Sequence, residues 1–154
     1  MSNLELKIPP DVIWVVVAAL MWLAARATAG GLGLAEPLRR PLAVLLIVIG
    51  TALIVAARVA LEKAGTTWHP TQPGSTTALV SSGAYRFSRN PTYLGMQIVL
   101  ISWAVMLASP AAVLVSALFV VYINRFQIRP EESTLSISLG QEYSDYSRRV
   151  RRWV

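Results

Sequence analysis

Residues 42–61 read LAVLLIVIGTALIVAARVAL, and the one charge among these twenty positions is Arg58, near the end of the stretch. A helix needs about 20 residues, within a range of about 17 to 25, to cross the roughly 30 Å hydrocarbon core of a bilayer. The stretch therefore predicts a membrane-spanning helix over 42–61. It decides the fold class, because apolar residues concentrated in this way separate a bilayer protein from a soluble domain with a large core.

The composition of the whole chain supports this interpretation. Of its 154 residues, 55% are hydrophobic and 14% are charged, whereas about a quarter of the residues of a typical soluble domain are charged. The chain has no cysteine, which excludes a disulfide framework and a catalytic thiolate. It has one histidine, which excludes the usual multi-histidine zinc sites, and no metal site is expected.

Three further apolar stretches complete an all-α integral membrane fold. With 42–61, we expect four transmembrane helices in a single domain over 1–154, the other three covering 12–34, 91–108 and 110–128. Ser109-Pro110 predicts a tight turn between the last two helices, with Pro110 opening its helix. A buried helical hairpin of a soluble protein is the alternative for these two shorter helices.

The N-terminal residues bear on whether the first helix is retained. Acidic Glu5 and Asp11 flank the one lysine there, and no small-residue cleavage site follows a short apolar core. We therefore expect a retained helix rather than a cleaved signal peptide. Arg26 lies inside the first stretch, and we expect it to extend toward the nearer interface, with a functional charge lining the bundle as the alternative.

Basic residues predict the orientation. With four spans, the connection over 62–90 and the tail over 130–154 lie on one side of the membrane, and that side is the more basic; its charges include Lys63, Arg86, Arg89, Arg129, Arg148, Arg149, Arg151 and Arg152. Short basic loops stay in the cytoplasm, so we expect a multi-pass protein of a bacterial or archaeal cytoplasmic membrane. The position of these basic residues at the membrane border favours anionic lipid headgroups as partners and argues against nucleic acid.

The segment over 130–154 has a second pattern. Tyr143, Tyr146, Val150 and Trp153 recur at intervals of three, four and three residues, which is typical of one face of a helix. Arginines lie beside and opposite this face. The pattern predicts an amphipathic C-terminal helix that lies in the membrane interface against anionic headgroups.

Two polar clusters remain as candidates for chemistry. Asn90 and Pro91 suit the cap and first turn of the third helix, whose free amides can hold a polar or anionic group. Gly95, one turn later, lets another group approach the backbone closely. Glu131 and Glu132 follow the fourth helix, and paired carboxylates suit a cationic or polyhydroxylated ligand. Because the third and fourth helices are adjacent, the two clusters can face one pocket on the cytoplasmic side.

The motifs around these clusters resemble a known family. Residues 79–95, LVSSGAYRFSRNPTYLG, look like the signature of isoprenylcysteine carboxyl methyltransferases and their bacterial relatives, and phospholipid N-methyltransferases share a related pattern. The family's closing segment is similar to a second set of residues: Glu131-Glu132, Leu135, Gly140-Gln141-Glu142-Tyr143, Tyr146, Val150 and Arg152-Trp153-Val154. The resemblance covers roughly residues 66 to 154.

The resemblance implies an integral membrane methyltransferase that uses S-adenosyl-L-methionine. Carried over by position, it implies cofactor-binding roles for Thr77, Ala78, Leu79, Val80, Tyr85, Asn90, Pro91, Tyr93, Leu94 and Glu131. Arg125 or Arg129 matches the family's substrate-side arginine. Arg129 and Glu132 are the catalytic candidates, and Glu132 is the substitute for Glu131 at the cofactor.

The chemistry of this cofactor limits which methyl acceptors the protein can use without a general base. Its sulfonium is already a strong methyl donor, so the protein has to bind, orient and desolvate. A carboxylate acceptor needs no general base, whereas an amine must lose a proton, with Glu132, Tyr85 or His69 to assist. We therefore favour carboxyl O-methylation of a small lipid-like or isoprenoid-type acceptor, with phospholipid or amine N-methylation as the alternative. An NADPH-dependent membrane reductase and a non-catalytic scaffold are remote alternatives. For His69 we favour a structural or hydrogen-bonding role in its loop, with cofactor or proton work as the alternative.

Overall fold

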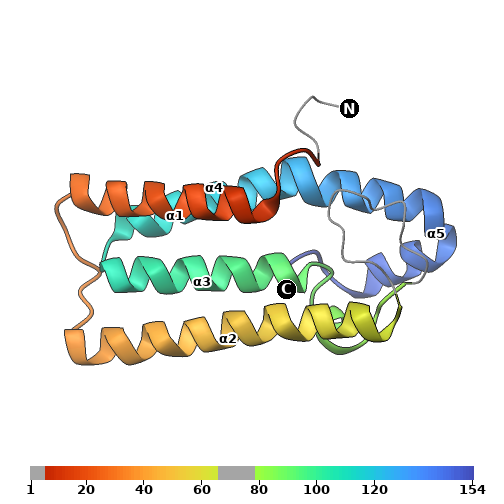
Figure 1. The fold of residues 1–154 in the computed structure, drawn as a ribbon, viewed down its shortest axis with the longest axis horizontal. Helices are drawn as coiled ribbons and strands as arrows, with labels where there is room; N and C mark the ends of the chain where they lie inside the picture. Colours follow the sequence, from red (N-terminus) through yellow and green to blue (C-terminus); the bar gives the residue numbers. More distant parts are fainter. Residues whose placement is uncertain (1–5, 66–78) are drawn as a thin grey trace.

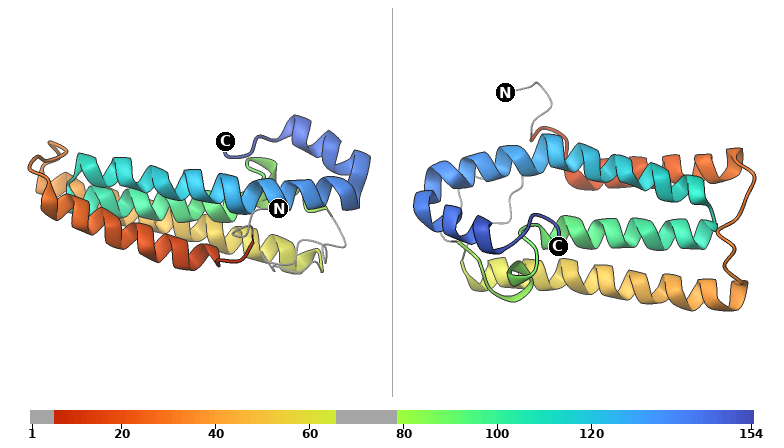
Figure 2. Two further views of the ribbon diagram at one scale, coloured as in Figure 1. Left: turned by 90° about the horizontal axis from the view of Figure 1, so that it is seen from above. Right: turned by 180° about the vertical axis from the view of Figure 1, so that it is seen from behind.

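The computed structural model describes residues 6–65 and 79–154, and the regular elements in these ranges are all helical (Figure 1). Four long helices lie side by side as a bundle, and a fifth projects beyond one end of it (Figures 1 and 2). In chain order the elements are α1 (Pro10–Ala27), α2 (Glu36–Lys63), the 3-10 turn η2 (Gly83–Arg86), α3 (Pro91–Leu107), α4 (Pro110–Ile123), the π-helical turn η3 (Asn124–Ile128) and α5 (Arg129–Arg149).

The helices have the length and surface of membrane spans. Three helical stretches of the described chain are long and apolar enough to cross a membrane, namely Pro10–Ala27, Glu36–Lys63 and the continuous Pro110–Arg149, and Pro91–Leu107 is apolar but shorter. Large apolar side chains such as Val48 on α2 and Leu114 on α4 point outward, which suits lipid and not water. The chain is therefore a membrane protein, and the crossing by α3 that makes four spans stays a prediction.

The longest of these stretches extends beyond the bilayer. The part before the non-helical residue Gly140, residues 110–139, rises about 45 Å, roughly one and a half times the thickness of the hydrocarbon core. Its apolar part ends at Ile123, because η3 contains Asn124, Arg125 and Gln127, and further charged residues follow from Arg129 onward. We therefore place α4 in the apolar layer, η3 at its boundary and α5 outside it.

Two helix boundaries differ from those predicted. The expected first helix, 12–34, is wrong at its end, because α1 stops at Ala27. Gly30 and Gly33 follow with φ of 120° and 67°, a backbone conformation that glycine adopts at no steric cost. The second helix starts earlier than residue 42, at Glu36, where Pro37 fits the first turn because its missing N–H has no helical partner there.

Small residues set the contact between α2 and α3. The buried residues of α2 are Ala43, Gly50 and Ala57, spaced by seven. A Cβ atom on Gly50 would come within 2.7 Å of the Gly95 carbonyl oxygen, and one on Gly95 within 2.6 Å of the Gly50 carbonyl oxygen. Small residues allow helices to approach closely in membranes. The close approach that we expected at Gly95 is therefore that of another helix.

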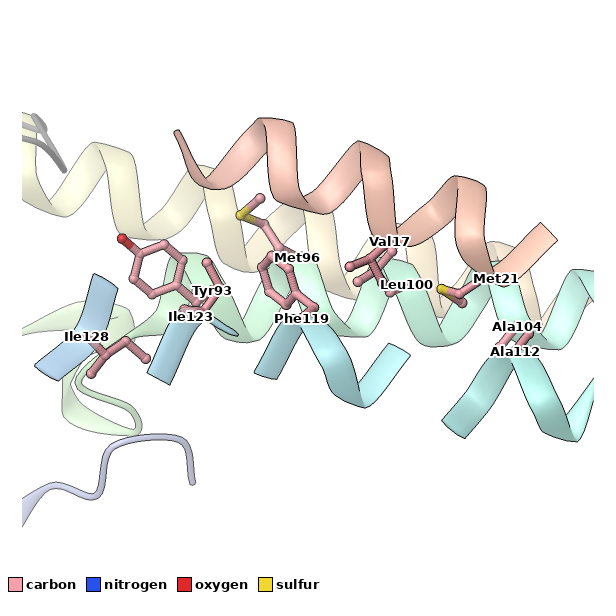
Figure 3. Packing of buried hydrophobic residues seen from close by; sticks show 10 residues of the cluster. All are labelled: Val17, Met21, Tyr93, Met96, Leu100, Ala104, Ala112, Phe119, Ile123 and Ile128. Carbon is pink, nitrogen blue, oxygen red and sulfur yellow. The ribbon is translucent and has the colours of Figure 1, made fainter. Parts of the chain in front are cut away.

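A shared apolar core joins α1, α3 and α4. Val17 and Met21 of α1 meet Leu100 of α3 and Phe119 of α4, and the cluster continues to Tyr93 and Ile128 at one end (Figure 3). The indole N–H of Trp14 donates to the Met96 carbonyl oxygen at 3.0 Å, a polar link between α1 and α3.

The π-helical turn η3 lies directly before α5. Pro130 has no N–H to donate to the carbonyl of Phe126, four residues earlier, and this carbonyl instead accepts a hydrogen bond from Leu6 N at 3.1 Å. The Gln127 side-chain amide donates to the Ile8 carbonyl oxygen at 2.8 Å. The segment before α1 is thereby bonded to the turn that leads into α5. The helix that we expected to end at residue 128 instead continues through the distorted turn η3 into α5.

The C-terminal region reverses direction at Gly140. This residue has φ 53° and ψ −121° inside α5, and the second half of α5 runs back toward the bundle (Figures 1 and 2). The prediction of one helix through Tyr143, Tyr146, Val150 and Trp153 is wrong at its end, because Val150 is extended. The tyrosines expected on a membrane-facing side are buried against the protein, with exposed fractions of 4% and 3%.

Replacement of Gly50 by alanine tests the close packing of α2 on α3. Alanine is a better helix former than glycine by about 1 kcal/mol, but its Cβ would overlap the Gly95 carbonyl, and overpacking costs about 1–3 kcal/mol. We expect Gly50→Ala to lower the thermal unfolding temperature in detergent by several degrees. Thr51→Ala, on the exposed side of the same helix, is the control and should change it little. An unchanged or higher unfolding temperature for Gly50→Ala would contradict the packing.

Candidate functional site

The start of α3 and the first turn of α5 meet at one end of the bundle. Ser109 begins α4 by accepting a hydrogen bond from Ala112 N at 3.2 Å through its side chain, so α3 and α4 run antiparallel through a short turn. After this turn, α4 runs back along α3 and brings the chain to the level of Tyr93. The Tyr93 hydroxyl donates to Glu131 Oε1 at 2.7 Å, which joins the two clusters that the sequence places far apart.

Tyr85 is the third member of this group. It lies on η2, which leads from residues 79–82 into α3. Burial, together with the nearby Tyr146 and Glu131, raises the pKa of the Tyr85 hydroxyl, and a hydrogen bond with Thr92 acts in the opposite direction. The Tyr146 hydroxyl donates to the Tyr85 carbonyl oxygen at 2.8 Å. Tyr85 is thus fixed beside Glu131 by the returning half of α5.

The Glu131 carboxyl has unusual electrostatics for a residue outside the apolar layer. Burial raises its pKa to about 8; the neighbouring Glu132 adds to the increase, and the hydrogen bond from Tyr93 opposes it. Burial favours the neutral form of a carboxyl because the charged form loses its hydration. A cation placed beside Glu131 would stabilise its charged form, so the site is suited to a cationic ligand.

Glu132 has a different environment. Its Oε1 lies 3.1 Å from an Arg89 guanidinium nitrogen and accepts a hydrogen bond from Arg152 Nε at 3.1 Å, and its Oε2 accepts one from Arg152 Nη2 at 2.5 Å. The side chains of Arg89 and Glu132 are 15% and 16% exposed. Both carboxylate oxygens are therefore engaged by guanidinium groups, and Glu132 fastens the C-terminal tail to the segment before α3. This position does not suit the catalytic role that we expected for it.

Asn90 and Ser88 hold the same tail through its backbone. The Asn90 side-chain amide donates to the Arg152 carbonyl oxygen at 3.0 Å, and the Ser88 hydroxyl donates to that oxygen at 3.2 Å. Arg89 N donates to the Arg151 carbonyl oxygen at 2.9 Å. Asn90 occupies the cap position of α3 as expected, but its side chain makes no capping hydrogen bond.

The other predicted cofactor residues differ in their exposure. Val80 and Pro91 are buried, and Leu79 and Leu94 are partly buried. Thr77, Ala78 and His69 lie outside the described residues. Of the predicted cofactor residues, the structure therefore brings Tyr85, Tyr93 and Glu131 into one group.

The predicted substrate-side arginines are exposed. The Arg125 guanidinium lies 5.3 Å from the centre of the Phe126 ring. Arg129 lies two positions before Glu131 on α5, and residues two apart do not face each other on a helix.

Three residues at this end were missed by the sequence reasoning. Arg89 and Arg152 were interpreted as basic charges at the membrane border, although both lie within the two quoted motifs. Asn124 accepts a hydrogen bond from the Trp153 indole N–H at 3.1 Å. A signal for these roles was available, since Arg152-Trp153 closes the second motif, but the pairing of Arg152 with Glu132 needs the reversal at Gly140.

Removal of the Glu132 charge should destabilise the fold. Breaking a buried ion pair leaves charges without a partner and costs about 3–5 kcal/mol; since the Arg152 side chain is 34% exposed, we expect Glu132→Gln to cost up to about 3 kcal/mol in thermal unfolding in detergent. Asp145→Asn is the matched control, because Asp145 pairs with Arg148 on the surface of α5 and exposed pairs contribute less than about 1 kcal/mol. Equal effects of the two substitutions would contradict the role of Glu132 as a fastening residue.

Known proteins match most of this chain. Residues 38–142 match the family model described as phospholipid methyltransferase. The chain is 30% identical over 143 residues to a protein-S-isoprenylcysteine O-methyltransferase of Rattus norvegicus, over 91% of this chain and 44% of the relative. It is 32% identical over 109 residues to a protein of the same name in Homo sapiens, over 69% of this chain and 37% of the relative.

A shorter protein of Haemophilus influenzae (strain ATCC 51907 / DSM 11121 / KW20 / Rd), described as uncharacterized, is 39% identical over 62 residues, which are 40% of this chain and 98% of that protein. The present chain thus spans less than half the length of the mammalian relatives and nearly all of the bacterial one. The family match extends from the start of α2 into the returning half of α5 and includes Tyr85, Tyr93 and Glu131. On these matches, the chain belongs to the phospholipid methyltransferase family.

Proposed function

We propose that the protein transfers a methyl group from S-adenosyl-L-methionine to a lipophilic acceptor, and that the reaction is carboxyl O-methylation of a small lipid-like or isoprenoid-type substrate. The observation that carries the proposal is the buried Glu131 carboxyl, held at 2.7 Å by the Tyr93 hydroxyl at the start of α3. The methyltransferase relatives support the reaction class.

The group around Glu131 fits the chemistry of this cofactor. S-Adenosyl-L-methionine, when bound, supplies a methyl group activated by a positive sulfonium sulfur. A buried carboxyl with a raised pKa can lose its proton and balance that positive charge, or accept hydrogen bonds from ammonium or ribose donors. Tyr85, Tyr93 and Glu131 would hold the cofactor, and Pro91 and Leu94 would lie behind them. Asn90 would act on the site through the tail that it binds.

The state of Glu132 favours a carboxylate acceptor. An amine acceptor needs a base for its proton, and both oxygens of Glu132 are engaged by Arg89 and Arg152. A carboxylate acceptor moves no proton: its oxygen forms a bond to the methyl carbon as the carbon–sulfur bond breaks, and the electron pair of that bond stays on sulfur. The protein would then contribute alignment and exclusion of water, and ideal alignment supplies about 7–11 kcal/mol.

The site belongs, in this proposal, on the cytoplasmic side of a bacterial or archaeal membrane. The exposed arginines Arg148, Arg149 and Arg151 are on the same tail that Glu132 fastens. Their charge would attract anionic lipid headgroups at this surface. The acceptor would reach the site from the lipid, and the cofactor from water.

Neutralisation of Glu131 tests the cofactor site. We expect Glu131→Gln to weaken binding of S-adenosyl-L-methionine in calorimetry by tenfold or more, about 1.4 kcal/mol, because the amide cannot balance a cation. Glu142→Gln, on the exposed surface of α5, is the control and should bind as the unmodified protein does. Unchanged binding by Glu131→Gln would remove Glu131 from the cofactor site.

The reaction itself is tested by product identification. Purified protein is incubated with methyl-labelled S-adenosyl-L-methionine and a total lipid extract, and we expect label in a base-labile methyl ester. Label in an amine headgroup would show that the reaction is N-methylation and not O-methylation. A thermal shift with NADPH alone would indicate a reductase, and no shift with either cofactor would indicate a scaffold.

The raised pKa of Glu131 predicts a pH dependence of cofactor binding. In the free protein this carboxyl keeps its proton below about pH 8, and a bound cation favours the deprotonated form. Binding therefore releases a proton, and the affinity should rise with pH by up to about tenfold per unit until the pH passes the pKa. Calorimetry from pH 6 to pH 9 checks this, with Glu131→Gln measured in parallel to remove the titration of the ligand itself. Parallel pH profiles for the two proteins would exclude the titration of Glu131.

A further inference from the structure

Gln97 is a polar side chain in the apolar part of α3. It lies one helical turn beyond Tyr93, about 6 Å further along the axis, and Leu94, Gly95 and Met96 lie between them. It therefore follows directly on the membrane side of the Tyr93–Glu131 pair. Polar side chains inside a membrane bundle are energetically costly and usually have a function.

The hydrogen bonds around Gln97 fix its orientation. The Ser116 hydroxyl donates to the Val113 carbonyl oxygen at 2.7 Å, so its one hydrogen is used. Ser116 can then only accept from Gln97, and Gln97 Nε2 donates to it at 3.2 Å. The other end of the amide, Oε1, is buried and has no hydrogen-bond partner among the residues that the structure describes. Ser116 thus holds the amide so that its carbonyl oxygen is unpaired.

An unpaired buried carbonyl oxygen requires a donor. Buried polar groups in native proteins are nearly always hydrogen-bonded, and the exceptions need an explanation. A carboxylate cannot supply the hydrogen, because it is an acceptor only. An N–H group on the carbon next to that carboxylate can supply it, and such a head group is short enough to place its carboxylate toward the Tyr93 end.

We propose that Gln97 Oε1 accepts a hydrogen bond from an N–H of the methyl acceptor, so that Gln97 selects lipid-tailed carboxylates with an adjacent amide. This inference rests on the proposed function, carboxyl O-methylation at the Glu131 site. Gln97 is a specificity-determining residue in this scheme: it contributes to binding of the acceptor and leaves cofactor binding unchanged.

Two probes that differ at the nitrogen test this selection. Palmitoylglycine has an N–H beside its carboxylate, and palmitoylsarcosine has an N–CH₃ in its place. With the full chain in detergent and saturating S-adenosylhomocysteine, we expect at least tenfold tighter binding of palmitoylglycine. Gln97→Met, which keeps the length of the side chain, should lose this preference and keep its affinity for S-adenosyl-L-methionine.

The contrary outcomes are distinct. A preference that persists in Gln97→Met, or that is absent from the unmodified protein, would overturn the role of Gln97. Binding of the cofactor with no binding of either probe would overturn the acceptor class. No binding of S-adenosyl-L-methionine to the unmodified protein would overturn the proposed function itself.

A stability measurement separates this role from a structural one. If Oε1 is unpaired until the acceptor binds, palmitoylglycine with saturating S-adenosylhomocysteine should raise the unfolding temperature of the unmodified protein more than that of Gln97→Met. If Gln97 only links α3 to α4 through Ser116, the substitution should lower the unfolding temperature of the ligand-free protein and leave the rise caused by palmitoylglycine unchanged, and that result would overturn the inference. Gln141→Met, on the exposed surface of α5, is the matched control and should change little.

Discussion

The ion-pair cluster of Glu132 with Arg89 and Arg152 joins three parts of the chain that are far apart in sequence. It links the segment before α3, the first turn of α5 and the C-terminal tail. Since Glu131 is the preceding residue, the same contact fixes the first turn of α5 against α3 and sets the neighbouring carboxyl opposite Tyr93. The two adjacent glutamates thus have separate environments, because Glu132 is paired with two arginines and Glu131 accepts a hydrogen bond from the Tyr93 hydroxyl.

Much of the fold was accessible from the sequence because lipid imposes simple rules. Long apolar runs predicted the helices, and Ser109-Pro110 predicted the turn between α3 and α4, which Ser109 caps. The end of α1 was misjudged because apolar residues continue through the glycines after Ala27, and hydropathy does not register backbone freedom. Gly95 was associated with a ligand because a lone glycine does not identify its neighbour, which is Gly50 on another helix.

The candidate site was less accessible, for a different physical reason. The periodicity argument assumes one continuous helix, and on this assumption the helix was predicted to continue from Tyr143 past Val150. The positive φ of Gly140 turns the chain back, so Tyr143 and Tyr146 pack on the protein and Arg152 reaches Glu132. A reversal at a single glycine changes which surfaces meet without changing composition or charge. Ionic contacts between distant segments depend on such reversals, and local sequence patterns do not predict where a reversal occurs.

The hydrogen bond from Leu6 N to the Phe126 carbonyl oxygen is made by main-chain atoms on both sides. Any residue except proline supplies the same N–H, although the φ of 58° at Leu6 favours residues that tolerate the left-handed region. The bond anchors the segment before α1 to the turn that carries the chain toward Glu131. A change of side chain at this position can therefore leave the contact in place, and a comparison of side chains alone would not detect it.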